Sequence, residues 1–340
     1  MSAVLPREAS VVNLLAPERL ELTSTPLAEL GQDDIVCETL VTAISPGTEM
    51  AAYLGAPPLR DGVTFPRLLG YCNVARVLAR GSDVRSIEVG DRILSFTSHR
   101  SHFVMRESDV LVRITSDVRS EDVVCAYLFH LGYNAVLRSD VRPGSRVLVI
   151  GMGALGLTSV AMASLAGATV TGLTDQPKPA GIAREFGASA VHGRAALSAE
   201  LSDGRLSPAD VVIVTTNSWA DWDMALSAAG QRGTIAVLGF PGRGEPPPAG
   251  NPLDSRHFYV KQLRIEAVGA SPERPDSRGF ARFNQRDNLA YLVEQIERGT
   301  LKPGALVSGV YAAHDIRSAY EDLRSRKNSP ITFLLRWSQN

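Results

Sequence analysis

Apolar residues occur in short runs along the chain, and one such run is followed at once by closely spaced glycines. Val147 to Ile150 are four consecutive β-prone apolar residues, and the motif Gly-Met-Gly-Ala-Leu-Gly begins directly after them. A continuous apolar run of this length is typical of a parallel strand that is buried on both faces. Leu157 to Leu165 then resembles a helix, and Thr169 to Leu173 is β-prone again. This order predicts a strand, a glycine turn, a helix and a second strand.

The same pattern divides the chain into a β-rich part and an α/β part. Before about residue 126, short alternating runs such as Ile35 to Ala43 are separated by turn residues, which predicts a small β-rich domain. Apolar spacing becomes helical from Asp122 to Leu137, strand-like and helix-like runs then alternate, and Tyr259 to Gly269 has the pattern of a last strand. This alternation predicts an α/β fold with a doubly wound parallel sheet and helices on both faces.

Each glycine of the turn has a separate role in a dinucleotide site. The first permits a tight turn, the second lets the backbone approach a pyrophosphate, and the third lets helix and strand pack closely. Phosphates would bind the free N–H groups at the helix N-terminus, where the dipole favours negative charge. An isolated GxGxxG can be an ordinary βα turn, but here its neighbours occur in the expected order. We therefore expect these residues to bind a dinucleotide: Gly151, Met152, Gly153, Ala154, Leu155 and Gly156.

Composition and charge narrow the classes of function. The 340 residues suffice for about two domains, and 44% apolar with 21% charged residues is ordinary for a globular protein. A net charge of −1 gives no electrostatic reason to expect nucleic acid or an anionic membrane as a partner. No apolar run reaches the ~20 residues of a membrane span, and the first residues lack a signal-peptide pattern. With three widely spaced cysteines, which we interpret as reduced thiols, a cytoplasmic protein is expected.

Several short motifs, in this domain order, resemble the medium-chain dehydrogenase/reductase superfamily: Ile44 to Glu49, Leu69 to Cys72, Val89 to Arg92, the glycine turn, Gly233 to Gly239 and Asn251 to Asp254. The resemblance covers nearly the whole chain. It implies a GroES-like catalytic domain formed by residues 1–126 and 271–340, and a Rossmann domain formed by residues 127–270. It also implies a cofactor between the two domains and a homodimer paired through the Rossmann sheet edge, using Ile235 to Phe240 and Leu263 to Val268.

The chain departs from zinc-dependent members of that superfamily at the positions of their metal ligands. Where those enzymes have a Cys before Gly-Thr-Asp and a His within Gly-His-Glu, this chain has Pro46 and Tyr71. Zinc needs about three protein ligands of Cys, His or carboxylate type. A different site from Cys72, His99 and His102 stays an alternative. The sequence thus favours a zinc-independent branch, similar to bacteriochlorophyllide dehydrogenase-like and quinone oxidoreductase-like proteins, and predicts no metal.

Two ways of counting give different residues for the choice between NAD and NADP. Counting back from Gly187 gives Thr174, which together with Lys178 favours NADPH. Counting forward from Gly156 gives Asp175, an acidic residue that favours NADH. NADP is slightly preferred, and both stay open. The ends of two later strands are expected at the nicotinamide ribose and ring, respectively: Thr215, Thr216 and Asn217, then Leu238, Gly239 and Phe240.

Hydride transfer without zinc requires another group that donates a proton or hydrogen bond to the reacting oxygen. Tyr71 stands where the zinc-binding His would be, so it is the first candidate donor; its alternative role is to fill the vacated space. Tyr53 follows the turn at Ser45 to Glu49 and is expected to line the pocket. His130, on the helix that enters the Rossmann domain, is a further candidate, and its alternative role is that of a structural helix histidine. Ser45 and Thr48 occupy the turn that meets the nicotinamide in relatives, or they only hold that turn by hydrogen bonds.

These features together predict a zinc-independent NAD(P)H-dependent oxidoreductase. The first hypothesis is interconversion of an alcohol and a ketone on a small or secondary-metabolite-like substrate. The second is an enone or quinone reductase that adds hydride to a conjugated C=C, and the third is a dinucleotide-binding protein without catalysis. The partners expected are a small-molecule substrate and a second copy of the chain.

Overall fold

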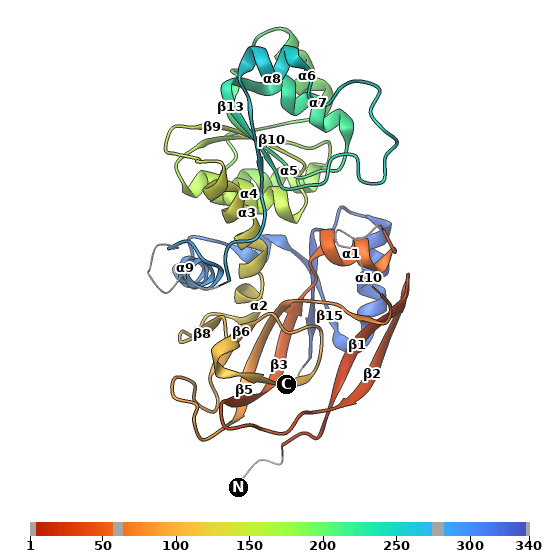
Figure 1. Cartoon of the computed structure of the whole chain (residues 1–340), viewed down its shortest axis with the longest axis vertical. Coiled ribbons are helices and arrows are strands. Elements are labelled where there is room, and N and C mark those ends of the chain that lie inside the picture. The colour runs from red at the N-terminus through yellow and green to blue at the C-terminus, as the bar shows by residue number, and fades with distance from the viewer. Residues whose placement is uncertain (1–4, 57–63, 274–281, 338–340) are drawn as a thin grey trace. The chain divides into compact units, whose positions relative to one another are not determined.

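The chain folds as two compact units, which are described separately (Figure 1). The computed structural model describes residues 5–56, 64–273 and 282–337. One unit contains residues 1–127 and 278–340, and the other contains residues 128–277. Their boundaries lie one residue (127 against 126) and seven residues (277 against 270) from those expected from the sequence. Within the part of the chain that the structure describes, none of the helices has the length and apolar character required to cross a membrane.

The unit of residues 128–277 is built on a six-stranded parallel sheet, in the order β11-β10-β9-β12-β13-β14. The predicted central strand is β9, and all four of its residues 147–150 are buried. Because β10 lies on one side of β9 and β12 on the other, the strand order reverses here, and ligands of such sheets bind at the carboxyl ends of these strands. The strands are β9 (Arg146–Ile150), β10 (Thr169–Leu173), β11 (Ala190–His192), β12 (Ala209–Val214), β13 (Ala229–Val237) and β14 (Arg264–Ala267).

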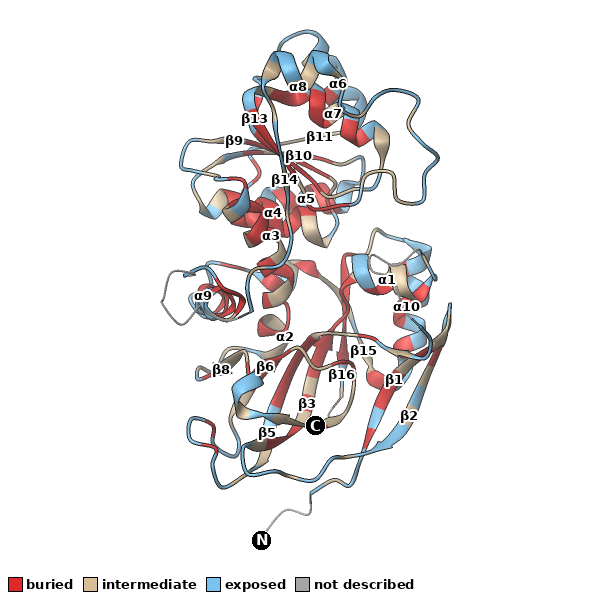
Figure 2. Cartoon of the chain, in the orientation of Figure 1, coloured by how far each residue is buried: buried red, intermediate tan, exposed pale blue. Residues whose placement is uncertain are grey.

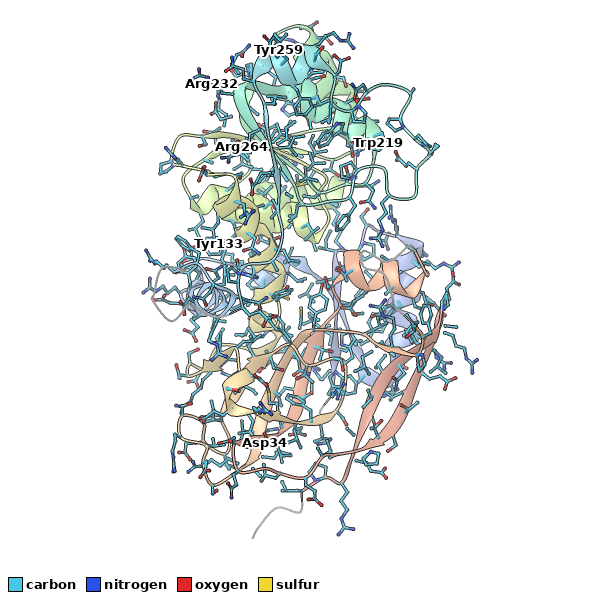
Figure 3. The ribbon with its side chains drawn as sticks, in the orientation of Figure 1. Asp34, Tyr133, Trp219, Arg232, Tyr259 and Arg264 are labelled. Carbon is cyan, nitrogen blue, oxygen red and sulfur yellow. The ribbon has the colours of Figure 1, made fainter. Side chains whose placement is uncertain are left out.

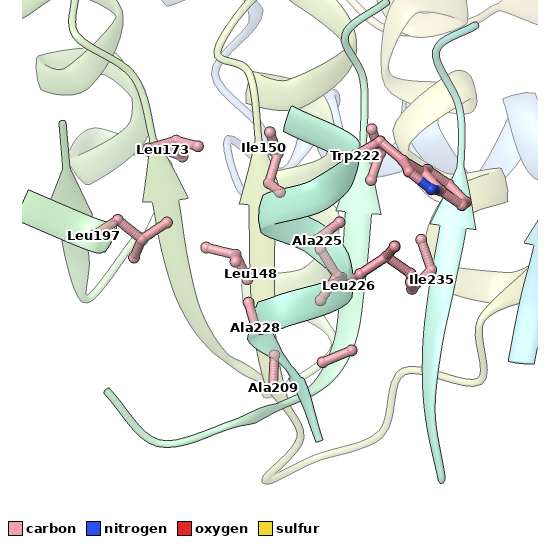
Figure 4. Packing of buried hydrophobic residues seen from close by; sticks show 13 residues of the cluster. Leu148, Ile150, Leu173, Leu197, Ala209, Trp222, Ala225, Leu226, Ala228 and Ile235 are labelled. Carbon is pink, nitrogen blue, oxygen red and sulfur yellow. The ribbon is translucent and has the colours of Figure 1, made fainter. Parts of the chain in front are cut away.

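Helices cover this sheet and bury its apolar side chains. Trp222 and Leu226 of α7 pack over Leu148 and Ile235 of the sheet (Figure 4). Most residues of α4 are buried, as Figure 2 shows in red, which agrees with its largely apolar sequence. The helices are α3 (Ala126–Arg138), α4 (Ala154–Leu165), α5 (Pro177–Glu185), α6 (Arg194–Ser202), α7 (Trp219–Ala228) and α8 (Ser255–Lys261). A doubly wound sheet beside a β-rich unit is the fold class that the sequence predicts.

The other unit combines the N-terminal strands with the C-terminal return of the chain. Its larger sheet has the order β15-β16-β3-β5-β6-β8, with β7 also paired to β3. The last strand, β16, runs antiparallel to β3, so that Leu334 pairs with Ala43. The strands are β1 (Glu8–Ala16), β2 (Arg19–Pro26), β3 (Asp34–Ala43), β4 (Arg67–Leu68), β5 (Cys72–Arg80), β6 (Arg92–Ser95), β7 (His102–Arg106), β8 (Val112–Ile114), β15 (Val307–Ala312) and β16 (Thr332–Arg336).

Short helices connect and cover these strands. A smaller sheet, β2-β1-β4, accompanies them. Tyr320 of α10 is fully buried among side chains of β1, β2 and β16, so the C-terminal segment is part of the core of this unit. The helices are α1 (Pro46–Tyr53), α2 (Ser120–Val123), α9 (Gln285–Glu297) and α10 (Ile316–Ser325), with 3-10 turns at Glu107–Asp109, Pro303–Leu306 and Ala313–Asp315.

Four expectations about local structure are wrong. The turn expected at Ser45 and Thr48 is the start of helix α1, for which Ser45 is the N-cap residue. The predicted helix from Asp122 to Leu137 is two helices, α2 and α3. The first part of the predicted last strand is helical, because Asp254 caps α8 with a bond from the N–H of Arg256, and α8 continues to Lys261. Ile235 to Val237 belong to β13, which lies between β12 and β14, so the sheet edge expected there is already covered.

Candidate active site and cofactor site

The glycine turn after β9 has the geometry that each of its glycines predicts. Gly151 has φ of +90°, a conformation that glycine adopts readily, and a Cβ there would lie 2.5 Å from Thr216 Cγ2. A Cβ on Gly156 would lie 1.7 Å from the carbonyl oxygen of Gly151, so helix and turn are in direct contact. Gly153 is exposed, and a Cβ there would meet nothing within 4 Å. The middle glycine therefore leaves room beside the N-terminus of α4.

The end of β12 holds this turn in place and brings a free hydroxyl to it. Thr215 Oγ1 donates to the carbonyl oxygen of Ile150 at 2.9 Å and lies 3.2 Å from that of Gly151. Thr216 Oγ1 is buried and has no hydrogen-bond partner among the described residues. A buried polar atom without a partner costs free energy, so a ligand that bonded to Thr216 would recover it.

The remaining predicted cofactor residues lie at the same carboxyl edge but differ in exposure. Ala154 and Leu155 are half-buried in the first turn of α4, while the Met152 side chain is turned inward onto Gly172. A Cβ on Gly239 would lie 2.3 Å from the carbonyl oxygen of Thr216, so the ends of β12 and β13 touch.

The loop after β13 is joined to the loop after β12. Asn217 Oδ1 accepts a hydrogen bond of 3.1 Å from the Phe240 N–H. Leu238 is buried, whereas the Phe240 ring is exposed with the guanidinium of Arg243 at 5.5 Å from its centroid. The residues expected near the nicotinamide are thus brought together, although their role stays a prediction.

At the end of β10, Asp175 meets Arg194, the first residue of α6, which the sequence did not single out. Asp175 pairs with Arg194, whose Nη1 lies 2.6 Å from Oδ2 and whose backbone N–H donates to Oδ1 at 2.8 Å. This N–H and then the guanidinium hold the pKa of Asp175 below its usual value. Thr174 Oγ1 accepts from the Gln176 N–H at 3.2 Å, and Lys178 is exposed in the first turn of α5. Thr174 and Asp175 are the two positions expected to decide between NADP and NAD, and Asp175 forms an ion pair with Arg194.

In the other unit, a hydroxyl pair forms at the start of α1. The Tyr71 hydroxyl donates a hydrogen bond to Ser45 Oγ, and Thr48 also bonds to it. Burial raises the pKa of Tyr71 far above its usual value, which keeps the phenol protonated at neutral pH. Edge-to-face contact with Tyr127, at 5.2 Å between ring centroids, fixes the ring. Ser45, Thr48 and Tyr71 are therefore brought together as predicted residues of one site.

A buried polar network supports this pair, and its members were only partly expected. Glu49 Oε1 accepts the Ser45 N–H at 2.6 Å, and Oε2 lies 2.9 Å from His99 Nε2 and accepts the Tyr320 hydroxyl at 2.5 Å. The other ring nitrogen of His99 is 2.8 Å from Thr42 Oγ1. Glu49 thus holds the N-terminus of α1.

Two predicted site residues lie in cores instead. Tyr53 is 5% exposed, and its ring packs on Tyr320 at 5.1 Å between centroids, so the reason to expect it in a pocket is removed. His130 is fully buried in the other unit, and burial lowers its pKa to about 4. It is neutral near pH 7 and buried, which fits a structural helix histidine better than a proton donor.

Comparison with known proteins adds to this geometry. Residues 154–282 match the family model described as zinc-binding dehydrogenase. Sorbitol dehydrogenase of Bacillus subtilis (strain 168) is 22% identical over 281 residues, which cover 73% of this chain and 79% of that protein. These similarities support the medium-chain, zinc-binding-type dehydrogenase superfamily.

Solved structures that are described as dehydrogenases share the fold. A protein from Sinorhizobium meliloti 1021, described as a zinc-binding dehydrogenase and bound to NADP, aligns with a TM-score of 0.78 at 19% identity over 97% of this chain and 99% of that chain. A protein from Escherichia coli CFT073, described as a short chain alcohol dehydrogenase and complexed with NADH, aligns with a TM-score of 0.78 at 16% identity over 97% of this chain and 100% of that chain. At these identities the likeness establishes the α/β fold with its β-rich unit.

A dinucleotide fits the residues present, whereas a zinc ion does not. The open side of Gly153 and the unsatisfied Thr216 hydroxyl suit a diphosphate and its ribose. Among the residues that the structure describes, no three His, Cys, Asp or Glu side chains are grouped to hold a metal ion. This includes the alternative of Cys72, His99 and His102, and both ring nitrogens of His99 are already bonded. A neutral phenol such as Tyr71 is a poor ligand for zinc.

Proposed function

We propose that this protein is a zinc-independent, NAD(P)H-dependent oxidoreductase that interconverts an alcohol and a ketone on a small or secondary-metabolite-like substrate. The observation that carries the proposal is the Tyr71–Ser45 hydroxyl pair, in which Tyr71 stands at one expected zinc-ligand position and Ser45 directly precedes the other, Pro46. The match to a zinc-binding dehydrogenase model and the alcohol dehydrogenase names among the similar proteins support the reaction class.

The two units supply different parts of this chemistry. The turn Gly151 to Gly156 and the Thr216 hydroxyl would hold the dinucleotide, which when bound supplies or accepts the hydride. Reduction of a ketone builds negative charge on its oxygen, and a fixed hydrogen-bond donor stabilises that charge. Because Tyr71 donates to Ser45 Oγ, the Ser45 O–H is left to donate to the substrate oxygen. Tyr71 makes that O–H a stronger donor by polarising it.

The test is a binding and turnover experiment on the purified full chain. NADH and NADPH are titrated by nicotinamide fluorescence, and turnover is screened with secondary alcohols, ketones, enones and quinones. We expect one dinucleotide to bind and a ketone to give its alcohol, with activity kept in chelator and no stoichiometric zinc by elemental analysis. Stoichiometric zinc, or loss of activity on chelation, would refute zinc independence. Reduction of enones only at C=C supports the second hypothesis, and binding without turnover supports the third.

We also propose a homodimer that forms through β14. This strand is the last of the parallel sheet, and three of its four residues are exposed. Next to it, α8 exposes Tyr259 (84%) and Val260 (61%), and Ile265 of β14 itself is 41% exposed. Tyr259 and Arg264 lie on the outer surface of this unit (Figure 3). An exposed strand edge beside apolar side chains favours pairing with a second copy.

A further inference from the structure

Arg194 lies at the carboxyl edge of the sheet because of the register between two parallel strands. Leu173 of β10 pairs with His192 of β11, and Asp175 and Arg194 each come two residues later. The two side chains therefore leave the sheet at neighbouring points, on the edge where β9 enters the glycine turn. In dinucleotide sites this is the region of the adenosine ribose.

A second carboxylate fixes the arginine. Nε and Nη2 of Arg194 each lie 2.9 Å from an oxygen of Asp221, in the first turn of α7, and Asp221 is 1% exposed. Such a bidentate fork holds the guanidinium in one orientation. The third nitrogen, Nη1, bonds to Asp175. One positive group thus faces two carboxylates, and the formal charge of the cluster (+1 −1 −1) is −1.

This arrangement has opposite consequences for the two cofactors. An acidic residue at this place accepts hydrogen bonds from the ribose hydroxyls of NAD, whereas an arginine accommodates the 2′-phosphate of NADP. Half of the Asp175 side chain is exposed, so oxygen lone pairs remain for the hydroxyls. A 2′-phosphate would meet a cluster that is already net negative, and like charges repel.

We propose that Asp175 and Arg194 select NAD(H), and that Arg194 is a 2′-phosphate-binding cation that Asp175 masks. The proposal rests on the proposed function only in requiring that a nicotinamide dinucleotide binds at the glycine turn. It reverses the slight preference for NADP given by Thr174 and Lys178.

The experiment measures dissociation constants for NADH and NADPH by fluorescence titration. Four proteins are compared: wild type, Asp175→Asn, Asp175→Asn with Arg194→Gln, and Asp210→Asn. The last is a matched control, since Asp210 accepts from the N–H of Arg146 and pairs with its guanidinium in the same way, but at the amino ends of β9 and β12. Thermal unfolding of each variant checks folding. Should Arg194→Gln leave Asp221 too poorly paired to fold, adding Asp221→Asn removes that buried carboxylate charge.

We expect wild type to bind NADH more tightly than NADPH by about tenfold or more. Asp175→Asn should weaken NADH and tighten NADPH by about tenfold, and the added Arg194→Gln should abolish the gain for NADPH. Asp210→Asn should leave both constants unchanged. The proposal is overturned if wild type prefers NADPH, if Asp175→Asn leaves the ratio unchanged, or if Arg194→Gln does not affect the gain. If wild type binds neither dinucleotide, the proposed function itself fails.

Discussion

His99 Nε2 lies 2.9 Å from Glu49 Oε2, and both side chains are at most 2% exposed. Glu49 also accepts the Ser45 N–H and the Tyr320 hydroxyl, so Glu49→Ala would leave three buried donors without their acceptor. Loss of one partner from a buried network of this kind costs about 3–5 kcal/mol. We expect a loss of that order in the free energy of unfolding, measured by urea denaturation.

An exposed carboxylate provides the control for this prediction. Glu21 pairs with Arg19 at 3.0 Å, with both side chains well exposed. Solvated pairs contribute about 0–1 kcal/mol, so Glu21→Ala should change the unfolding free energy little. Equal effects of Glu49→Ala and Glu21→Ala would mean that the network does not stabilise the start of α1.

Tyr71→Phe tests the hydroxyl pair directly. Removing a hydrogen-bond donor to a developing oxyanion costs about 10²–10³ in kcat. Tyr71→Phe keeps the Ser45 donor and removes only the phenol that polarises it, so a loss below that range is expected. Dinucleotide binding should be unchanged, because the glycine turn belongs to the other unit. Since the pKa of Tyr71 is raised, its ionisation should not lower the rate as pH rises through about 10, the usual tyrosine pKa. Tyr127→Phe is the control, and a similar loss in both variants would refute a special role for Tyr71.

The sequence predicts those parts of the molecule that depend on local pattern. The strand, glycine turn and helix at 147–165 are specified by consecutive residues, and the structure agrees with them. The residues at the start of α1 were expected to form a turn because of the resemblance to relatives, although Pro46 also suits the first turn of a helix. A strand was predicted over part of α8 because Phe258 to Val260 are β-prone. The sequence signal for the helix was Asp254, since aspartate is a typical N-cap residue.

The parts that could not be predicted depend on register and packing between distant segments. Nothing in the spacing of Asp175, Arg194 and Asp221 shows that their side chains meet, because this follows from the pairing of β10 with β11 and the position of α7. Likewise, Tyr320 reaches Glu49 only because the C-terminal segment folds back onto the N-terminal strands.

Two glycine substitutions separate a ligand role from a packing role. Gly156→Ala puts a methyl group 1.7 Å from the carbonyl oxygen of Gly151, and overpacking of this kind costs about 1–3 kcal/mol or more. Gly153→Ala meets nothing within 4 Å, so stability should be kept while the methyl group occupies the space for the pyrophosphate. We expect weaker dinucleotide binding by about tenfold or more. Gly181→Ala in α5, equally open, is the control; weakened binding there, or normal binding in Gly153→Ala, would contradict this assignment.

His130 should make the protein less stable in acid. Its pKa is about 4 in the folded chain because of burial, against 6.5 for the unperturbed group. Between these values the unfolded chain binds a proton that the folded chain does not, so stability falls as pH drops from about 6.5 towards 4. A shift of this size corresponds to a loss on the order of 3 kcal/mol. Unfolding free energies of wild type and His130→Gln at several pH values measure it, with the exposed His314→Gln as control. An unchanged pH slope in His130→Gln would refute the assignment.

Val260→Glu tests whether the surface at β14 joins two copies of the chain. Val260 belongs to α8, beside the exposed edge of β14, and burying a charged side chain there in an interface is costly. If the dimer forms through this surface, the variant should be monomeric by light scattering coupled to size-exclusion chromatography, while wild type is dimeric. Val89→Glu is a closely matched control, because Val89 is 60% exposed and Val260 is 61% exposed, but Val89 lies in a turn of the other unit. A dimeric Val260→Glu protein, or a monomeric Val89→Glu protein, would place the interface elsewhere.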